Sequence, residues 1–244
     1  MQIIIKRYNK GIEREVPIMS KILESKNLCK TYYSNDVEFH ALKNVNLEIN
    51  QGEFVSIMGK SGSGKSVMIK CLIGLEEPDS GTITVMGKNI NQLEHWELDE
   101  LRTEIGFLFQ GSALYDSMSV RENLEFPLRR HTKKFGIIED TTPLVMEALE
   151  NVGLEHAIDL MPSELSGGMK RRIALARTLI LQPKIILYDE PTTGLDPITS
   201  KEIILLMMSI QKKYNTSSII ITHDVDCARV IANRMILLID NINY

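Results

Sequence analysis

Five short apolar segments, rich in β-branched residues, constrain the fold of this chain more than any other feature. They are EFVSIMG, EIGFLFQ, KIILYDE, SSIIITHD and RMILLID, beginning at residues 53, 104, 184, 217 and 234. Unbroken apolar runs of this length are typical of strands buried on both faces, as in a parallel sheet. Between them lie amphipathic segments such as SKEIILLMMSIQKKY, with apolar residues at helical spacing. Strands that alternate with helices predict an α/β domain.

The order of these segments predicts the domain organisation. The 244 residues are enough for one large domain. Alternating strand patterns with turns such as NQGE and PDSG predict a small antiparallel sheet in the N-terminal part, and residues of about 92–180 read as a helical insert. We therefore expect one domain over residues 22–240, with a mixed sheet as its core. Met19 opens MSKILESKNL, which is typical of a chain start, so residues 1–18 are interpreted either as an N-terminal extension or as the result of a mis-assigned start codon.

Composition argues against several classes of protein. The formal net charge is −4 at pH 7, so the chain lacks the basic excess that binds nucleic-acid phosphates. Its 3 cysteines are scattered and predict no disulfide framework. Cys227 follows His223 by four residues, but two ligands do not make a zinc site. No apolar run approaches the ~18 residues of a membrane span.

A glycine-rich segment between a predicted strand and a predicted helix is the first candidate site. GKSGSGKS matches the pattern G-x-x-x-x-G-K-[ST] and lies between EFVSIMG and the helical pattern SVMIKCLIGL. The glycines let backbone amides wrap a phosphate chain, the lysine adds positive charge, and the last hydroxyl can bind Mg²⁺. The predicted phosphate-binding residues are Gly59, Lys60, Ser61, Gly62, Ser63, Gly64, Lys65 and Ser66.

Polar residues close three of the other apolar runs, at the strand ends where α/β proteins bind their ligands. Asp189 and Glu190 end one run, Gln110 ends a second, and His223 follows a third. Beside a phosphate-binding loop, Asp189 suits the Mg²⁺ shell and Glu190 suits the activation of an attacking water. An ordinary structural role is the alternative for these residues, above all for the lone His223.

The stretch MPSELSGGMKRR, residues 161–172, predicts a second anion site. Ser166, Gly167 and Gly168 lie just ahead of a helical pattern, where a serine hydroxyl and bare amides bind anions. Because the first loop already accounts for one triphosphate, the second site is best explained by a nucleotide that a second subunit holds. The basic residues 170–172 are interpreted as a solvated helix face, with the last of them packing near the serine.

Together, these segments resemble the ATP-binding cassette (ABC) family. GKSGSGKS is similar to its Walker A motif, Gln110 to its Q-loop and LSGGM to its signature motif. IILYDE is similar to Walker B, GLD at 194–196 to the D-loop and His223 to the switch histidine. The six motifs follow the family's order over residues of about 22–240. The resemblance implies a P-loop ATPase fold and an enzyme that hydrolyses ATP with Mg²⁺.

The resemblance also implies how the site residues work. Two cassettes face head to tail, and each ATP lies between the P-loop of one and the signature motif of the other, so a homodimer is expected. Tyr32, or its rival Tyr33, stacks on adenine. The other implied roles are γ-phosphate binding across the dimer by Ser166, Gly167 and Gly168, a link between the two sites by Asp196, catalysis by Glu190 and His223, and Mg²⁺ binding by Ser66, Gln110 and Asp189.

One residue departs from the family's signature motif, which usually ends in glutamine. Met169 stands at that position. A methionine side chain cannot donate a hydrogen bond, but the backbone and the Ser166 hydroxyl remain. At most a modest effect on nucleotide binding is expected.

The amino-acid sequences of two segments resemble those of the ATPases of Mla-type phospholipid transport systems. They are GSALYDSMSVRENLEFPLRRH, residues 111–131, and MPSELSGGMKRR. This resemblance implies a membrane permease and an MCE-type lipid-binding protein as partners, and a position at the cytoplasmic face of the inner membrane. A cassette of an amino-acid or lipoprotein transporter is one alternative, and a soluble ABC ATPase without a transport role is another.

Overall fold

The computed structural model describes residues 2–6, 20–34, 37–136 and 138–239, and the chain divides into two compact units. The first unit comprises Met1–Asp99 and Ser217–Tyr244, and the second comprises Glu100–Thr216. The second unit begins and ends later than the predicted insert of about 92–180. The reason is that strands β7 (Ile105–Leu108) and β8 (Ile185–Asp189) pair with each other inside it.

Four strands of the first unit form a sheet in the order β1-β10-β4-β9. They are β1 (Gln2–Lys6), β4 (Phe54–Gly59), β9 (Ser217–Ile221) and β10 (Arg234–Ile239). β4 runs parallel to β9 and β10, and β1 runs antiparallel to β10. Every residue of β9 is buried, which confirms the strand type that its unbroken apolar run predicts. Of the predicted extension 1–18, only β1 lies among the described residues.

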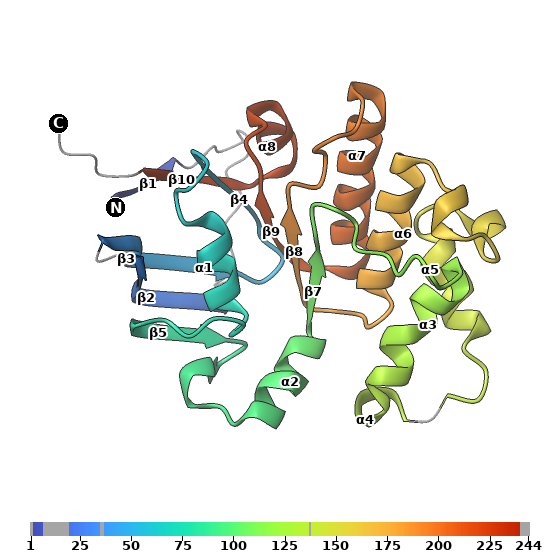
Figure 1. The fold of residues 1–244 in the computed structure, drawn as a ribbon, viewed down its shortest axis with the longest axis horizontal. Helices are drawn as coiled ribbons and strands as arrows, with labels where there is room; N and C mark the ends of the chain where they lie inside the picture. The colour runs from blue at the N-terminus through green and yellow to red at the C-terminus, as the bar shows by residue number, and fades with distance from the viewer. Residues whose placement is uncertain (1, 7–19, 35–36, 137, 240–244) are drawn as a thin grey trace. The chain divides into compact units, whose positions relative to one another are not determined.

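The predicted antiparallel sheet is confirmed in the same unit. Its order is β3-β2-β5-β6, formed by β2 (Lys21–Ser34), β3 (Val37–Asn50), β5 (Ser80–Val85) and β6 (Lys88–Asn89). Figure 1 shows β2, β3 and β5 as neighbouring arrows in blue to green, next to helix α1. The other elements of this part of the chain are α1 (Lys65–Leu72), the 3₁₀ turn Ile90–Gln92, α2 (His95–Thr103) and α8 (Val225–Ile231).

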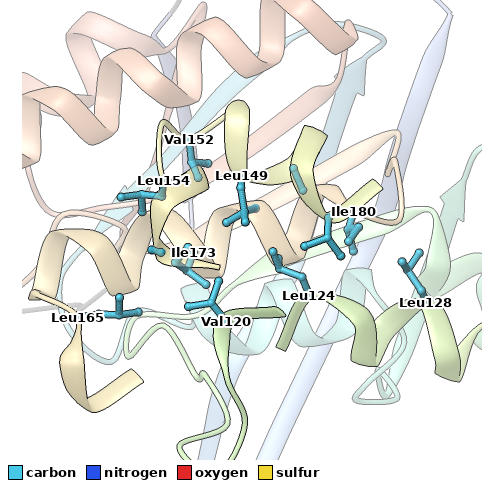
Figure 2. Close-up of a cluster of buried hydrophobic side chains, with 13 residues drawn as sticks. Val120, Leu124, Leu128, Leu149, Val152, Leu154, Leu165, Ile173 and Ile180 are labelled. Atoms are coloured by element: carbon cyan, nitrogen blue, oxygen red, sulfur yellow. The ribbon is translucent and has the colours of Figure 1, made fainter. Parts of the chain in front are cut away.

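Helices dominate the second unit. They are α3 (Val120–Arg130), α4 (Thr132–Phe135), α5 (Thr142–Glu150), α6 (Gly167–Leu179) and α7 (Pro197–Tyr214), with 3₁₀ turns at Glu155–Ala157 and Pro162–Glu164. Apolar residues four apart on α3, namely Val120, Leu124 and Leu128, pack with Leu149 of α5 and Ile173 of α6 in one buried cluster. Figure 2 shows these side chains converging between the helices. The cluster gives the unit a core of its own.

None of the helices described here is both long enough and apolar enough to cross a membrane. The longest of them is α7, with 18 residues, and it carries lysines in its last turn.

Candidate nucleotide-binding site

The predicted phosphate-binding loop forms the turn between β4 and α1, where sterics require its glycines. Gly64 has a φ of 82°, in the left-handed region, and a Cβ there would lie 2.2 Å from the carbonyl oxygen of Ala41. A Cβ on Gly59 would lie 2.5 Å from Ser63 Oγ and 2.8 Å from the carbonyl oxygen of Leu238. Only glycine permits this tight path, which is the path of a backbone cradle for phosphate.

The electrostatics of this loop favour an anion. Helix α1 has no acidic residue in its first turn, so no local charge opposes the positive end of the helix dipole. Lys65 Nζ donates hydrogen bonds to the carbonyl oxygens of Gly59, at 2.7 Å, and Lys60, at 2.8 Å. These bonds hold the ammonium group over the loop. Ser63 Oγ is buried without a hydrogen-bond partner among the described residues, and a bound phosphate would supply one.

The structure distinguishes the two aromatic candidates for adenine stacking. Tyr32 is tethered, because its hydroxyl donates a hydrogen bond to Glu76 and Lys30 Nζ lies 5.7 Å from its ring centroid. Burial, together with the bond to Glu76, raises the pKa of Tyr32. Tyr33 is 77% exposed against 36% for Tyr32, and its hydroxyl contacts only the exposed Glu38, at 3.3 Å, among the described hydrogen bonds. A ring that is already held loses less freedom on binding, which favours Tyr32.

His223 lies at the same edge of the sheet as the phosphate-binding loop. Ile57 of β4 pairs with Ile221 of β9, and the two strands are parallel. Gly59 and His223 each come two residues later, so both lie at the carboxyl edge of this strand pair. His223 is exposed. The next residue, Asp224, caps α8, because its Oδ1 accepts hydrogen bonds from the backbone amides of Asp226, at 2.9 Å, and Cys227, at 3.0 Å. The cap fixes the backbone that carries the histidine.

In the second unit, Gln110 and Glu190 lie just beyond the ends of two paired strands, at equivalent positions. Leu108 of β7 pairs with Tyr188 of β8, and each polar residue follows two positions later. Glu190 has a φ of 47°, a left-handed conformation that is strained for a residue with a side chain. Thr193 Oγ1 donates a hydrogen bond to Glu190 Oε2 at 3.1 Å and orients the carboxylate. Strain of this kind is concentrated at functional sites.

Ser166 begins helix α6, as the sequence predicts. It is the exposed N-cap, and its Oγ accepts a hydrogen bond from the amide of Met169 at 3.2 Å. The first turn of α6 carries no acidic residue. Gly168 also has a packing role, because a Cβ there would lie 2.8 Å from Thr199 Cγ2 of α7. Close helix packing is therefore a second reason, beside an approaching anion, for one of the two adjacent glycines.

Asp196 is the N-cap of α7. Its Oδ1 accepts hydrogen bonds from the amides of Ile198 and Thr199, each at 3.0 Å. Hydrogen bonding from Thr199 lowers the pKa of Asp196, which stabilises its charged form at the positive end of the helix. The cap accounts for an aspartate at this place, and the link between two subunits stays a prediction.

The basic residues of α6 require a correction. We expected residues 170–172 to form a solvated face, but Arg171 is only 4% exposed. Its Nη1 donates to the carbonyl oxygen of Phe109 at 2.7 Å, and its Nη2 donates to that of Gln110. The sequence pattern gives no sign of these bonds, because backbone carbonyls far along the chain accept them. Arg171 is thus a residue at the site that sequence analysis missed.

A groove of about 480 Å³ opens on the second unit beside Phe109, the residue before Gln110. Phe109 and Tyr115 are 46% and 43% exposed, and the ring centroids of Tyr115 and Phe126 lie 4.9 Å apart. No carboxylate is among the described residues that line the groove. Its aromatic and basic lining comprises Phe107, Phe109, Tyr115, Phe126, Arg102, Arg130, His131 and Arg177. An exposed aromatic hollow of this kind is typical of a protein-binding surface.

The residues predicted for Mg²⁺ offer the oxygen ligands that this ion prefers. They are the hydroxyl of Ser66 in the first turn of α1, the exposed amide of Gln110 and the partly buried carboxylate of Asp189 at the end of β8. Within the described residues, no three or more histidine, cysteine and acidic side chains gather as a metal cluster. In proteins, Mg²⁺ usually keeps several waters and shares its remaining ligands with a phosphate chain.

Comparisons with known proteins show the family to which the chain is related. A sequence model of the family described as ABC transporter matches residues 42–193. The probable ribonucleotide transport ATP-binding protein mkl of Mycobacterium leprae (strain TN) is 41% identical over 220 residues, or 90% of this chain and 62% of that protein. The intermembrane phospholipid transport system ATP-binding protein MlaF of Haemophilus influenzae is 40% identical over 220 residues, or 90% of this chain and 81% of that protein.

A solved structure has the same fold. It is the dimeric structure of a post-hydrolysis state of the ATP-binding cassette MJ0796 bound to ADP and Pi, with a TM-score of 0.80 and 37% identity over 88% of this chain and 94% of that chain. The fold class that the motifs imply is confirmed by this likeness. The chain spans less than two thirds of the length of mkl, and the two sequence relatives are named for different transported substrates.

Proposed function

Because the chain belongs to the ABC transporter family, we propose that it is the ATP-binding and ATP-hydrolysing subunit that energises a membrane permease. The geometry of the loop between β4 and α1 carries this proposal. Gly64 follows a path on which a side chain would clash with the carbonyl oxygen of Ala41, and Lys65 Nζ lies within 2.8 Å of two loop carbonyls. An ammonium group held over the loop by these carbonyls supports the assignment of Lys65 to the terminal phosphates.

In this proposal, the first unit binds the nucleotide. The loop amides and the N-terminus of α1 receive the phosphates, and Lys65 offsets their negative charge. Tyr32 stacks on adenine, with its ring held through Glu76 and Lys30. The buried hydroxyl of Ser63 turns to a phosphate oxygen and gains the partner that it lacks among the described residues.

Polar residues at the strand ends carry out hydrolysis. Glu190 is the general base, which accepts a proton from the attacking water. We assign Mg²⁺ to Ser66, Gln110 and Asp189; when bound, the ion neutralises charge on the phosphate oxygens. His223 assists the same reaction as the switch histidine. The strained backbone of Glu190 and its bond from Thr193 support this assignment, because both restrict the direction of its carboxylate.

We further propose that two copies of the chain form a head-to-tail dimer around two ATP molecules. The dimeric form of the similar cassette MJ0796 supports this arrangement. Ser166, Gly167 and Gly168 of one copy then contact the γ-phosphate held by the other, and Asp196 links the two sites. Since ATP contacts both faces only in the closed dimer, it favours that state through its differential affinity.

The groove beside Phe109 is the proposed docking surface for the permease. Its exposed rings and four basic side chains match a short permease helix that carries apolar and acidic side chains. Residues 111–131, which resemble Mla-type ATPases, supply Tyr115 and Phe126 to the groove. A cassette that docks in this way lies at the cytoplasmic face of the inner membrane.

For the cargo, we propose phospholipid, with an MCE-type lipid-binding protein in the assembly. The likeness of residues 111–131 and 161–172 to Mla-type ATPases supports this choice, together with the 40% identity to MlaF.

The cargo and the partners are tested by copurification. The tagged chain with Glu190→Gln is expressed in the organism from which it comes, and the membranes are extracted in mild detergent with ATP. A permease with an MCE-type protein and bound phospholipid is expected. A permease with a different binding protein would refute the lipid assignment alone.

Hydrolysis is tested on the purified chain. Glu190→Gln should still bind ATP and Mg²⁺ but lose turnover by roughly 10²–10⁴-fold, because the amide cannot accept the proton of the attacking water. Glu150→Gln, at the exposed end of α5, is the control and should hydrolyse ATP at the normal rate. Near-normal turnover in Glu190→Gln would contradict the assignment of the general base.

A further inference from the structure

Two arginines of helix α6 hold the backbone that follows strand β7. We call residues 109–113 the Q segment. Arg171 donates to the carbonyl oxygens of Phe109, at 2.7 Å, and Gln110. Arg177 donates to those of Ala113, at 2.8 Å, and Ser112, at 3.2 Å. Four carbonyls of this five-residue segment therefore accept hydrogen bonds from one helix.

The burial of Arg171 is not explained by stability alone. Arg171 is 4% exposed, and burial lowers the pKa of its guanidinium because a charge in a dry interior is unfavourable. No described carboxylate forms an ion pair with it, and its Nε is buried without a hydrogen-bond partner among the described residues. An apolar side chain of similar size would pack here without that penalty. The bonds to the Q segment are what the arginine adds.

The Q segment is strained where the arginines hold it. Ser112 and Ala113 have φ values of 63° and 50°, left-handed conformations that disfavour side chains. Just before the segment, β7 lies against α6 so closely that a Cβ on Gly106 would lie 2.5 Å from Thr178 Cγ2. These contacts oppose sliding and relaxation of the segment. Its conformation depends on α6.

We propose that Arg171 is a positioning residue, which fixes the backbone of Gln110. The side-chain amide of Gln110 is thereby directed at the Mg²⁺–nucleotide, and Gln110 moves together with α6, the helix that begins after Ser166. This inference rests on the proposed function for the role of Gln110. Among the described hydrogen bonds, those of Arg171 go to backbone carbonyls of the segment, so it acts through Gln110 and not on the reacting atoms. Arg177 supports the far end of the segment and lies 5.6 Å from the ring of Tyr115 in the groove.

The test replaces Arg171 by glutamine and by lysine. Hydrogen exchange of the amides of residues 110–113, without nucleotide, reports the tether directly. The Mg²⁺ concentration for half-maximal ATPase activity reports the position of Gln110. We expect faster exchange in Arg171→Gln and a rise of about 10-fold in that Mg²⁺ concentration, the range seen when the support of a metal ligand is lost. ATP binding in EDTA, measured with a fluorescent analogue, should stay unchanged.

Arg172→Gln is the matched control on the same helix. It removes bonds to the carbonyl oxygen of Val152, at 3.2 Å, and to Glu202, at 2.7 Å, without touching the Q segment. It should lower the melting temperature but leave the Mg²⁺ titration and the exchange of residues 110–113 unchanged. Should Arg171→Gln not fold, Arg171→Lys takes its place, because one ammonium cannot reproduce the guanidinium fork.

A folded Arg171 variant with normal exchange and a normal Mg²⁺ titration would overturn the inference. A Mg²⁺ effect of equal size in Arg172→Gln would also overturn it, because a general loss of stability would then explain both. If the unaltered chain hydrolyses no ATP at any Mg²⁺ concentration, the proposed function fails instead. In that case, the exchange measurement still decides whether Arg171 holds the segment.

Discussion

Replacing Gly64 by alanine is expected to destabilise the chain and to abolish nucleotide binding, and the structure sets the size of the effect. At a φ of 82°, an alanine costs about 1–2 kcal/mol in the free energy of unfolding. Its Cβ would also lie 2.2 Å from the carbonyl oxygen of Ala41, so the backbone must move by about 1 Å or more. Overpacking of this kind typically adds about 1–3 kcal/mol. The sum is about 2–5 kcal/mol.

Gly62→Ala provides the matched control in the same loop. Its φ is 80°, but a Cβ there would meet no described atom within 4 Å. Only the conformational cost of about 1–2 kcal/mol applies. Thermal unfolding without nucleotide, followed by circular dichroism, compares the two variants, at about 2–4 °C for each kcal/mol in a chain of this size. Equal losses of melting temperature in both variants would refute the reasoning.

Three further changes have defined outcomes. Leu124→Ala removes a fully buried side chain from the core of the second unit and should cost about 2–5 kcal/mol of unfolding free energy in urea denaturation; a cost near zero would contradict that core. Hydrogen bonding from Thr199 holds the pKa of Asp196 below its ordinary 3.8. The charged cap therefore contributes fully to the stability of the fold above pH 3.8, and this contribution is lost as the pH falls through the lowered pKa. The melting temperature of Asp196→Asn should lack this acid-dependent loss. Tyr32→Phe keeps the ring but removes its tether, so ATP affinity should fall about 2–10-fold in a fluorescence titration, whereas Tyr33→Phe should bind as before; equal losses would argue against Tyr32 as the stacking residue.

The strands and helices of this protein could be predicted from the sequence because their signals are local. The segments at 53–59 and 217–224 each contain a short run rich in apolar and β-branched residues, and the structure contains β4 and β9 there, with every residue of β9 buried. The helical spacing at 200–214 likewise falls within α7. Side-chain periodicity and strand length depend on neighbours a few positions away, so they can be recognised in the sequence without knowledge of the fold.

The candidate site residues could also be located from the sequence, because the motifs themselves encode their backbone requirements. The glycines of GKSGSGKS mark a path that excludes side chains, and the structure shows that exclusion at Gly59 and Gly64. Polar residues that close apolar runs mark strand ends. The register of β7 against β8, which places Gln110 and Glu190 at one level, is given by the structure and not by the motifs.

Tertiary structure alone decided which side chains hold these motifs in place. Arg171 looks like a surface residue in the sequence, yet it is buried against carbonyls 61 and 62 positions earlier in the chain. Tyr32 and Tyr33 are chemically identical, and tertiary structure separates them: Tyr32 bonds to Glu76, 44 residues away, whereas Tyr33 is 77% exposed. Hydrogen bonds to backbone carbonyls and contacts between distant elements leave no periodic pattern. They arise only when the chain has folded, so no inspection of neighbouring residues reveals them.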